Sequence, residues 1–453
     1  MIKTNRHDII WNYAANILNI GVSIVVLPLI LKMLTAEEVG LWYVFLSISS
    51  LALLIDFGFS STLMRHISYA VSGASEILEE GVPHQIGEEP NYPLVKSIVF
   101  AAKGIYRSLA LIATLTLSIG GTTYIIYVLN IREMDLILAW GLYALASILS
   151  ILSSFWLPIL KGCGAIKAAN KVTIFSKLTY LILAAFGLSF RGGLVLLTAA
   201  YLLSIVLMWI WSQIEFKRHL GPAYVQSHKN ESYHIKEVFA RIWPNSKRSG
   251  LVNIGAWLTN RGSTLISSYF LGLEVTGQFG VTVQLLTVVG NISSLLFNTY
   301  LPELASTRTR QNDKRFKQLF SRAILVQWML TILGNFGVVF IIPILLTWIN
   351  VSTVLLPQPW LLIMSMILFL EQNHSTFAVL ITLSNKVPFV PASLISGISI
   401  IIISFTLVSM GYNIGSIILT QGVVQLAYNN WAWPYRVFKE NTLSFNSIFK
   451  LWR

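Results

Sequence analysis

Charged residues are scarce in this chain. Asp, Glu, Lys and Arg together make up 11% of its 453 residues, whereas soluble globular proteins carry about 25%. Apolar residues make up 55%, and they occur in runs longer than the ~20 residues that a helix needs to cross a bilayer. The composition therefore excludes a soluble globular protein and predicts an all-α polytopic membrane protein.

Residues that carry catalytic chemistry are also scarce. The single cysteine, Cys163, excludes an intramolecular disulfide, and the seven histidines form no cluster. The sequence contains no Gly-rich phosphate-binding loop and no metal-ligand spacing. We therefore expect no catalytic residue, no metal and no cofactor, and an ATP-driven pump is disfavoured.

The apolar runs predict about twelve transmembrane spans. Their expected limits are 9–34, 39–68, 98–129, 136–160, 172–190, 193–213, 249–270, 278–306, 318–349, 358–383, 388–410 and 413–433. The first run is too long for the apolar region of a signal peptide, and no small-residue cleavage site follows it. We expect it to remain as an uncleaved anchor.

The basic residues indicate how these spans are oriented. With the N-terminus inside, nearly all of the 32 Lys and Arg residues fall on the inner side, and the exceptions are Lys32, Arg132, Arg191 and the intramembrane Arg261. The positive-inside rule then places both termini in the cytoplasm. The net charge of +13 is thus a topology signal, and we expect no nucleic-acid partner.

One turn occurs twice in the chain. The segment 34–40, LTAEEVG, returns in the second half as 271–277, LGLEVTG, which aligns Gly40 with Gly277. Parallel repeats of this kind build secondary transporters. The repeat predicts two six-helix lobes around a central cavity.

The repeat and the charge distribution together predict three regions. The N-lobe comprises 1–213 and the C-lobe comprises 249–453, which ends in a short cytoplasmic tail. A cytoplasmic linker, 214–248, joins them and contains an amphipathic helix at 235–243. We expect that helix to lie on the inner membrane surface.

Polar side chains recur at helical spacing in three of the expected spans. They are Asn12, Asn16 and Asn19 in the first span, Asn253, Trp257 and Asn260 in the seventh, and Gln284, Asn291 and Asn298 in the eighth. Such residues either bond neighbouring helices or face a water-filled cavity. The eighth-span stripe covers fourteen rises of ~1.5 Å, roughly 21 Å, which favours a cavity that solvates hydroxyl-rich cargo, with Trp257 against a sugar ring.

Ionisable residues inside the spans are few. Arg261 lies midway along the seventh span, where an uncompensated cation costs from ~3 to over 10 kcal/mol. It can hold a phosphate or pair with Glu371, which lies at similar depth in the tenth span. Asp56, Glu371 and His374 are candidates for coupling to H⁺ or Na⁺, and the alternative for each carboxylate is a hydrogen bond between helices.

Basic residues also gather at the inner ends of the second to fourth spans. They are Arg65, Lys103, Arg107 and Lys161. Together they could form a vestibule that attracts a diphosphate from the inner leaflet, and ordinary positive-inside anchoring is the alternative for each. Lys103 and Arg107 are the better candidates because they share one helix face.

Several of these motifs occur in one order that resembles a known family. The motifs are Trp11-Asn12 and the helix through Pro28, the turn and following residues at 34–42, and Asp56-Phe57-Gly58. This order is similar to that of the O-antigen and polysaccharide flippases of the multidrug/oligosaccharidyl-lipid/polysaccharide (MOP) exporter superfamily. Relatives often carry an acidic residue early in the seventh span, where this chain has Asn260 and Arg261.

The resemblance implies a flippase of a bacterial inner membrane that works by alternating access. Its cargo would be an undecaprenyl-diphosphate-linked oligosaccharide for O-antigen or lipopolysaccharide synthesis, with membrane lipids and other polysaccharide-assembly proteins as partners. Arg261 and Arg65 would match the cationic cavity residues of the family. The main alternative is a cation-coupled exporter of drugs or metabolites. A membrane polysaccharide polymerase is less favoured because outer loops such as 130–135 are short.

Overall fold

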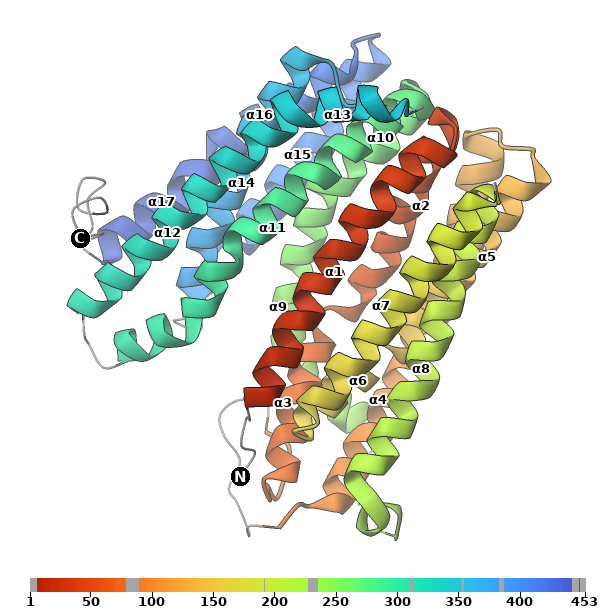
Figure 1. The fold of residues 1–453 in the computed structure, drawn as a ribbon. Helices are drawn as coiled ribbons and strands as arrows, with labels where there is room; N and C mark the ends of the chain where they lie inside the picture. Colours follow the sequence, from red (N-terminus) through yellow and green to blue (C-terminus); the bar gives the residue numbers. More distant parts are fainter. Residues whose placement is uncertain are drawn as a thin grey trace. The chain divides into compact units, whose positions relative to one another are not determined.

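The structure is a computed structural model that describes residues 6–78, 89–190, 192–226, 235–309, 313–351, 354–382, 387–441 and 448. These residues form helices joined by turns, without a strand among them (Figure 1). Eight of the helical segments are long and apolar enough to cross a membrane. The protein is therefore an all-α, multi-pass membrane protein, as its composition predicts.

The helices of the first half correspond to the first six predicted spans. They are α1 (Arg6–Met33), α2 (Ala36–Leu53), α3 (Phe59–Val71), α4 (Tyr92–Leu115), α5 (Met134–Ser153), α6 (Trp156–Gly162), α7 (Ile166–Ser189) and α8 (Gly193–Gln226). Within this half α8 packs against α5 and α7, and α7 packs against α1. Part of the expected linker is thus helical, because α8 continues to Gln226, and residues 227–234 lie outside the described part.

The helices of the second half correspond to the remaining six. They are α9 (Ile235–Trp257), α10 (Ser263–Phe270), α11 (Leu273–Thr309), α12 (Asp313–Phe336), α13 (Ile342–Ile349), α14 (Gln358–Thr382), α15 (Val390–Ser409), α16 (Ile414–Ala427) and α17 (Asn429–Glu440). In this half α11 packs against α12 and α14, and α14 packs against α17.

Short segments of different pitch interrupt the spans. They are the 3₁₀ turn η1 (Leu54–Asp56) and the π-helical segments η2 (Thr116–Gly121), η3 (Tyr124–Val128), η4 (Leu258–Gly262) and η5 (Gly337–Ile341). Single π-helical turns inside α-helices are frequent at functional sites. Two of them, η4 and η5, lie beside the cavities described below.

The chain divides into two compact units. The first comprises Met1–Leu34 and Phe45–Asn253, and the second comprises Thr35–Val44 and Ile254–Arg453. The start of α2 therefore packs within the second unit, although the predicted N-lobe included it. A capping box begins this helix, since Thr35 N donates to Glu38 Oε2 (2.8 Å) and Glu38 N donates to Thr35 Oγ1 (3.2 Å).

The two copies of the repeated turn meet inside the second unit. A Cβ atom added to Gly40 would lie 1.9 Å from the carbonyl oxygen of Leu273, and one added to Gly277 would lie 3.2 Å from the backbone nitrogen of Gly40. Further along, Tyr43 OH donates a hydrogen bond to Gln284 Oε1 (2.6 Å). The paired glycines thus let α2 and α11 cross with their backbones in contact.

The second predicted span, 39–68, is not one continuous helix. It breaks after η1, where Phe57 (φ 45°) and Gly58 (φ 78°) both adopt the left-handed conformation. This conformation is unfavourable for phenylalanine, and packing holds it in place. The Phe57 ring lies against Gly250, where an added Cβ would be 1.7 Å from Phe57 Cδ1.

The last predicted span, 413–433, is likewise two helices, α16 and α17, separated at Tyr428.

The amphipathic segment 235–243 lies within α9, in one continuous helix with the start of the seventh span. Its aromatic side chains pack on the first unit. The ring centroids of Phe239 and Phe59 are 5.5 Å apart, and those of Trp243 and Phe57 are also 5.5 Å apart. These contacts bury part of the apolar face of the segment within the first unit.

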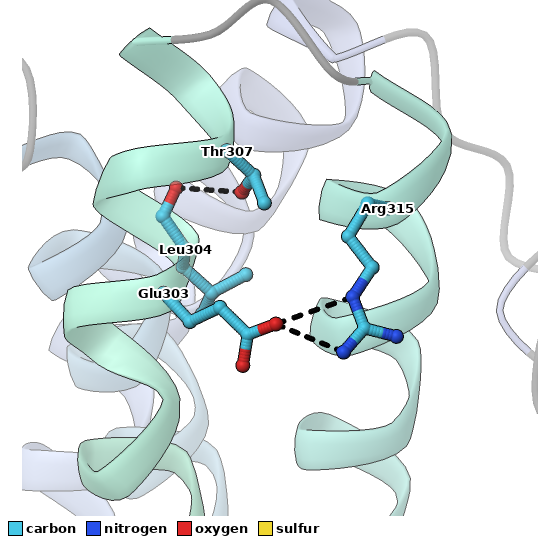
Figure 2. A network of polar contacts seen from close by, with 4 residues as sticks. All are labelled: Glu303, Leu304, Thr307 and Arg315. Carbon is cyan, nitrogen blue, oxygen red and sulfur yellow. Dashed lines mark hydrogen bonds and ion pairs between the residues drawn. The ribbon is translucent and has the colours of Figure 1, made fainter.

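An ion pair joins the last turns of α11 to the first turn of α12. Arg315 Nη2 and Nε both donate to Glu303 Oε1, at 2.9 and 3.2 Å (Figure 2). Nearby, Thr307 Oγ1 donates to the carbonyl oxygen of Leu304 (Figure 2). Because Arg315 and Glu303 are both exposed, we expect the pair to contribute at most about 1 kcal/mol.

Candidate functional site

A polar cavity of about 330 Å³ lies within the second unit. Four helical segments line it. They contribute Asn260 and Arg261 from η4, Val283, Leu286, Thr287 and Gly290 from α11, Thr331 and Asn335 from α12, and Leu368, Phe369, Glu371, Gln372 and Ser375 from α14. We call this space the arginine cavity. It brings together Arg261 and Glu371, the two residues that the sequence placed at similar depth.

Arg261 enters the cavity from a π-helical turn. The turn η4 separates α9 from α10, and the Asn260 side chain folds back onto it, donating to the carbonyl oxygen of Ala256 (2.9 Å). A π-helical turn places one more residue in the turn than an α-helix does. The next residue, Gly262, leaves no space for a side chain, since an added Cβ would lie 2.2 Å from Ile401 Cδ1. Gly262 therefore packs closely against Ile401, directly after Arg261.

Glu371 is buried, and one of its oxygens has a defined partner. Gln421 Nε2, on α16, donates to Glu371 Oε1 at 2.9 Å. The carboxyl group is therefore held between α14 and α16 while it lines the arginine cavity.

His374, three residues further along α14, is held by a different element. Its Nδ1 atom lies 2.7 Å from Asn430 Oδ1 on α17. It is not among the residues that line the arginine cavity. The structure therefore gives Glu371 and His374 separate surroundings, although helical spacing puts them on one face.

The residues of the predicted polar stripe on α11 lie in different surroundings. Gln284 accepts the hydrogen bond from Tyr43, while Asn291 and Asn298 are exposed and do not line the cavity. Thr287 and Gly290, between them, do line it. Thr287 is thus a cavity residue, and it lies on α11 between Gln284 and Asn291 at helical spacing.

The other predicted glycan-facing residues lie on α1 and α9. Asn16, Asn19 and Asn253 have exposed side chains, and Trp257 is partly buried. The side chain of Asn12 lies outside the described part of the structure. None of the described members of this group contributes to the arginine cavity.

Asp56 takes part in a hydrogen-bond network of the first unit. Tyr106 OH donates a short hydrogen bond to Asp56 Oδ1, and Ser60 Oγ donates to the same oxygen at 3.3 Å. Ser60 Oγ and Tyr106 OH are also 3.1 Å apart. The carboxylate therefore bridges the break between α2 and α3 to α4, which is the structural role that the sequence had left open for it.

The predicted basic residues occupy several helices of the first unit. Arg65, Lys103 and Arg107 are exposed and Lys161 is partly buried. Lys103 Nζ lies 5.3 Å from the ring centroid of Trp156, a cation–π contact. Lys217 of α8 lies within electrostatic range of Lys103, as Arg107 does. The sequence did not indicate Lys217 because α8 was expected to end near residue 213.

The described residues hold no group of three or more His, Cys, Asp or Glu side chains arranged to bind a metal ion. The chemistry available in the arginine cavity is therefore that of one guanidinium, one buried carboxyl group, and several amides and hydroxyls. Guanidinium groups bind phosphate with directed hydrogen bonds. The cavity therefore offers a cationic group for an anion and a carboxyl group for a cation.

Comparison with known proteins identifies the class of fold. No family model matches this sequence, and no curated protein sequence matches it. Solved structures do match over nearly the whole chain, and they are transporters of the MOP superfamily. The chain therefore has the fold of MOP superfamily transporters.

Three of these structures show the range of the class. An inward-facing multidrug resistance transporter of the MATE family has a TM-score of 0.61 at 13% identity, covering 95% of both chains. The lipid II flippase MurJ, in an inward closed conformation, has a TM-score of 0.62 at 15% identity, covering 98% of this chain and 89% of that one. A MOP superfamily transporter from Pyrococcus furiosus, described as having a binding pocket of reversed polarity, has a TM-score of 0.50 at 13% identity, covering 97% and 94%.

Proposed function

We propose that the protein is a flippase that carries an undecaprenyl-diphosphate-linked oligosaccharide across a bacterial inner membrane. The cargo would be an O-antigen or related repeat unit, moved from the cytoplasmic to the periplasmic leaflet by alternating access. The termini would lie in the cytoplasm, as the distribution of basic residues predicts. Such a protein is a transporter and not an enzyme.

The observation that carries this proposal is Arg261 in the arginine cavity. A guanidinium in the middle of an apolar span is costly, so such residues mark substrate sites by default. The cavity surrounds it with amides and hydroxyls, among them Asn260, Thr287 and Asn335. A diphosphate with an attached sugar matches this combination, because the first needs a cation and the second needs hydrogen-bonding groups. One protein of this fold is a lipid II flippase, so the fold is compatible with lipid-linked cargo.

The basic residues of the first unit would act before the cargo reaches Arg261. Arg107 and Lys217 both lie within electrostatic range of Lys103, and Arg65 and Lys161 add two more cations to this unit. Clusters of this kind attract anionic head groups at the cytoplasmic surface. We propose that they collect the diphosphate and that the exposed amides of α1 solvate the glycan.

Glu371 is our first candidate for coupling to H⁺ or Na⁺. It is buried, it lines the same cavity as Arg261, and it retains a hydrogen-bond donor in Gln421. A change in its charge would alter the electrostatic balance around Arg261, which is the link that coupling requires. Asp56 and His374 remain weaker candidates because each is bonded to a partner away from this cavity.

Translocation of a lipid-linked oligosaccharide in proteoliposomes tests the proposal. We would compare the wild type with Arg261→Ala, Arg261→Lys and the control Arg315→Ala, which removes an exposed guanidinium outside the cavity. We expect Arg261→Ala to lose at least ten-fold in rate, Arg261→Lys to retain part of it, and Arg315→Ala to match the wild type. Equal rates for Arg261→Ala and the wild type would refute the role of this cation.

A cation-coupled exporter of drugs or metabolites is the second candidate. The buried carboxyl group of Glu371 favours it, since a cationic compound can bind a carboxylate directly, and transporters of the same fold include multidrug resistance proteins. Export of a cationic dye by the wild type, with no movement of the glycolipid, would establish this function instead. In that case Arg261→Ala should be tolerated and Glu371→Gln should not.

A further inference from the structure

A second hollow lies on the second unit, between α12 with η5 on one side and α14 on the other. It has a volume of about 430 Å³, and eight of its ten lining residues are apolar. The side chains at its rim include Phe336, 57% exposed, and Met366, 56% exposed. Because α12, η5 and α13 together form a segment long and apolar enough to cross a membrane, we take this exposed apolar surface to be the one that faces lipid. We call this hollow the lateral groove.

The helix changes its pitch beside this hollow. The π-helical turn η5 follows α12 directly and contributes Val339 and Phe340 to the lining. A side chain of α14 hydrogen-bonds the backbone of this turn, since Gln358 Nε2 donates to the carbonyl oxygen of Val339 (2.9 Å). This hydrogen bond connects the start of α14 to η5, and both α14 and η5 line the groove.

The lateral groove adjoins the arginine cavity. Asn335 and Phe369 line both spaces, so they form the wall between them. Two hydrogen bonds join α12 to α14 on either side of Phe369. Asn335 Nδ2 donates to the carbonyl oxygen of Ser365 (3.1 Å), and Trp328 Nε1 donates to Asn373 Oδ1 (2.8 Å). An apolar space open to lipid and a polar space holding Arg261 are thus separated by two side chains.

We propose that the lateral groove binds the hydrocarbon chain of a single-chain lipid phosphate whose anionic end lies in the arginine cavity. This inference rests on the proposed function, because it takes the cargo to be lipid-linked. The molecule that matches both spaces is an amphiphile with one apolar chain and a negatively charged head. One groove accepts one chain, which fits a polyprenyl carrier better than a diacyl phospholipid. Rotation of Phe369 would connect the two spaces.

The depth of the groove also indicates at which stage of transport the hydrocarbon chain would bind. Ser365 lies seven residues after Gln358, the start of α14, which is roughly 10 Å along the helix at ~1.5 Å per residue. The groove is therefore in the half of the bilayer nearer the segment 350–357. With the termini in the cytoplasm, this half is the outer leaflet. The chain would occupy the groove as the cargo leaves the protein.

Photo-crosslinking of the full-length protein in liposomes tests this inference. The probe is a polyprenyl phosphate with a diazirine in its chain, and peptides from 332–340 and 362–370 are analysed by mass spectrometry. Met366→Trp and Leu362→Trp each fill the groove with a larger side chain. Met329→Trp is the matched control, because Met329 is 51% exposed on α12 and does not line the groove. Melting temperatures show that each variant is folded.

We expect both groove-filling variants to reduce labelling of these peptides at least five-fold, and the control to leave it unchanged. Equal labelling in all variants, or labelling only of other peptides, would overturn the inference. A diacyl phosphatidylglycerol that competes as well as polyprenyl phosphate would overturn the assignment to a single-chain lipid. If the wild type translocates glycolipid without labelling of the groove, this inference is wrong and the proposed function still stands. If the groove is labelled and no glycolipid moves, the proposed function fails and the lipid site remains.

Discussion

The crossing of α2 and α11 makes Gly40→Ala the sharpest test of the structure. An added methyl group at Gly40 would lie 1.9 Å from the carbonyl oxygen of Leu273 and 2.6 Å from its carbon. Real Cβ atoms essentially never approach other atoms within 3.0 Å. The two helices would therefore have to separate by at least about 1 Å, in a closely packed region that does not deform easily.

The expected magnitude follows from two opposing effects. Overpacking of this kind costs about 1–3 kcal/mol. Alanine favours a helix over glycine by about 0.8–1 kcal/mol, which offsets part of this cost. Separation of the helices would also strain the hydrogen bond from Tyr43 to Gln284. We expect a net loss of about 1–2 kcal/mol, roughly a ten-fold change in the unfolding equilibrium.

The assay is the apparent melting temperature in one detergent, measured for the wild type and three alanine variants. Gly277→Ala should be milder, because its Cβ would lie 3.2 Å from the nearest atom and a small shift would relieve the contact. Gly21→Ala is the control, since nothing lies within 4 Å of its added Cβ, and it should be at least as stable as the wild type. If Gly40→Ala melts no lower than Gly21→Ala, the proposed backbone contact is wrong.

Three further predictions concern single side chains. Tyr106→Phe removes a donor to the carboxylate of Asp56, so the melting temperature should fall by the equivalent of about 1.5–3 kcal/mol, and an unchanged value would mean that this bond is not formed. Glu371→Gln keeps an acceptor for Gln421 but cannot ionise, so we expect a folded protein whose transport no longer responds to an imposed pH or Na⁺ gradient. If transport by this variant still responds to the gradient, a residue other than Glu371 couples transport to the cation. Burial raises the pKa of the Cys163 thiol to about 12, so its reactive thiolate should be roughly a thousand-fold rarer at pH 8 than that of an exposed cysteine. A maleimide should therefore label the native protein slowly and the denatured protein fast, and fast native labelling would contradict the burial of Cys163.

The two intramembrane carboxylates now have different explanations. Asp56 receives hydrogen bonds from Tyr106 and Ser60 at the break between α2 and α3, so the geometry accounts for it as a structural group. Glu371 has one donor and lines the cavity that contains Arg261. The sequence treated them alike because each is a single acidic residue in an apolar run. Only their partners distinguish them.

In a membrane protein, the periodicity of apolar residues does not show which face of a helix is buried and which faces lipid. In a soluble protein the apolar face of a helix points to the core, but here the lipid-facing side of α12 is as apolar as its buried side. Phe336 is exposed and Phe320 is buried, although both are apolar positions of the same helix. The lateral groove could not be predicted for this reason.

The sequence by itself determined the class of the protein and its main plan. Run length and scarcity of charge require membrane-spanning helices, because every backbone polar group in hydrocarbon must be bonded within its own helix. The repeated turn indicated the duplication, and the depths of Arg261 and Glu371 could be counted along their spans. These properties depend on residues close together in the chain, so no tertiary information is needed.

Only the tertiary structure decided where the helices break and which side chains meet. The left-handed conformation of Phe57 is held by Gly250 and Trp243, almost two hundred residues away. The contact of Gly40 with Leu273 likewise joins distant segments. Such contacts select among backbone conformations whose local free energies differ by only a few kcal/mol. A local pattern therefore cannot choose between them, and packing does.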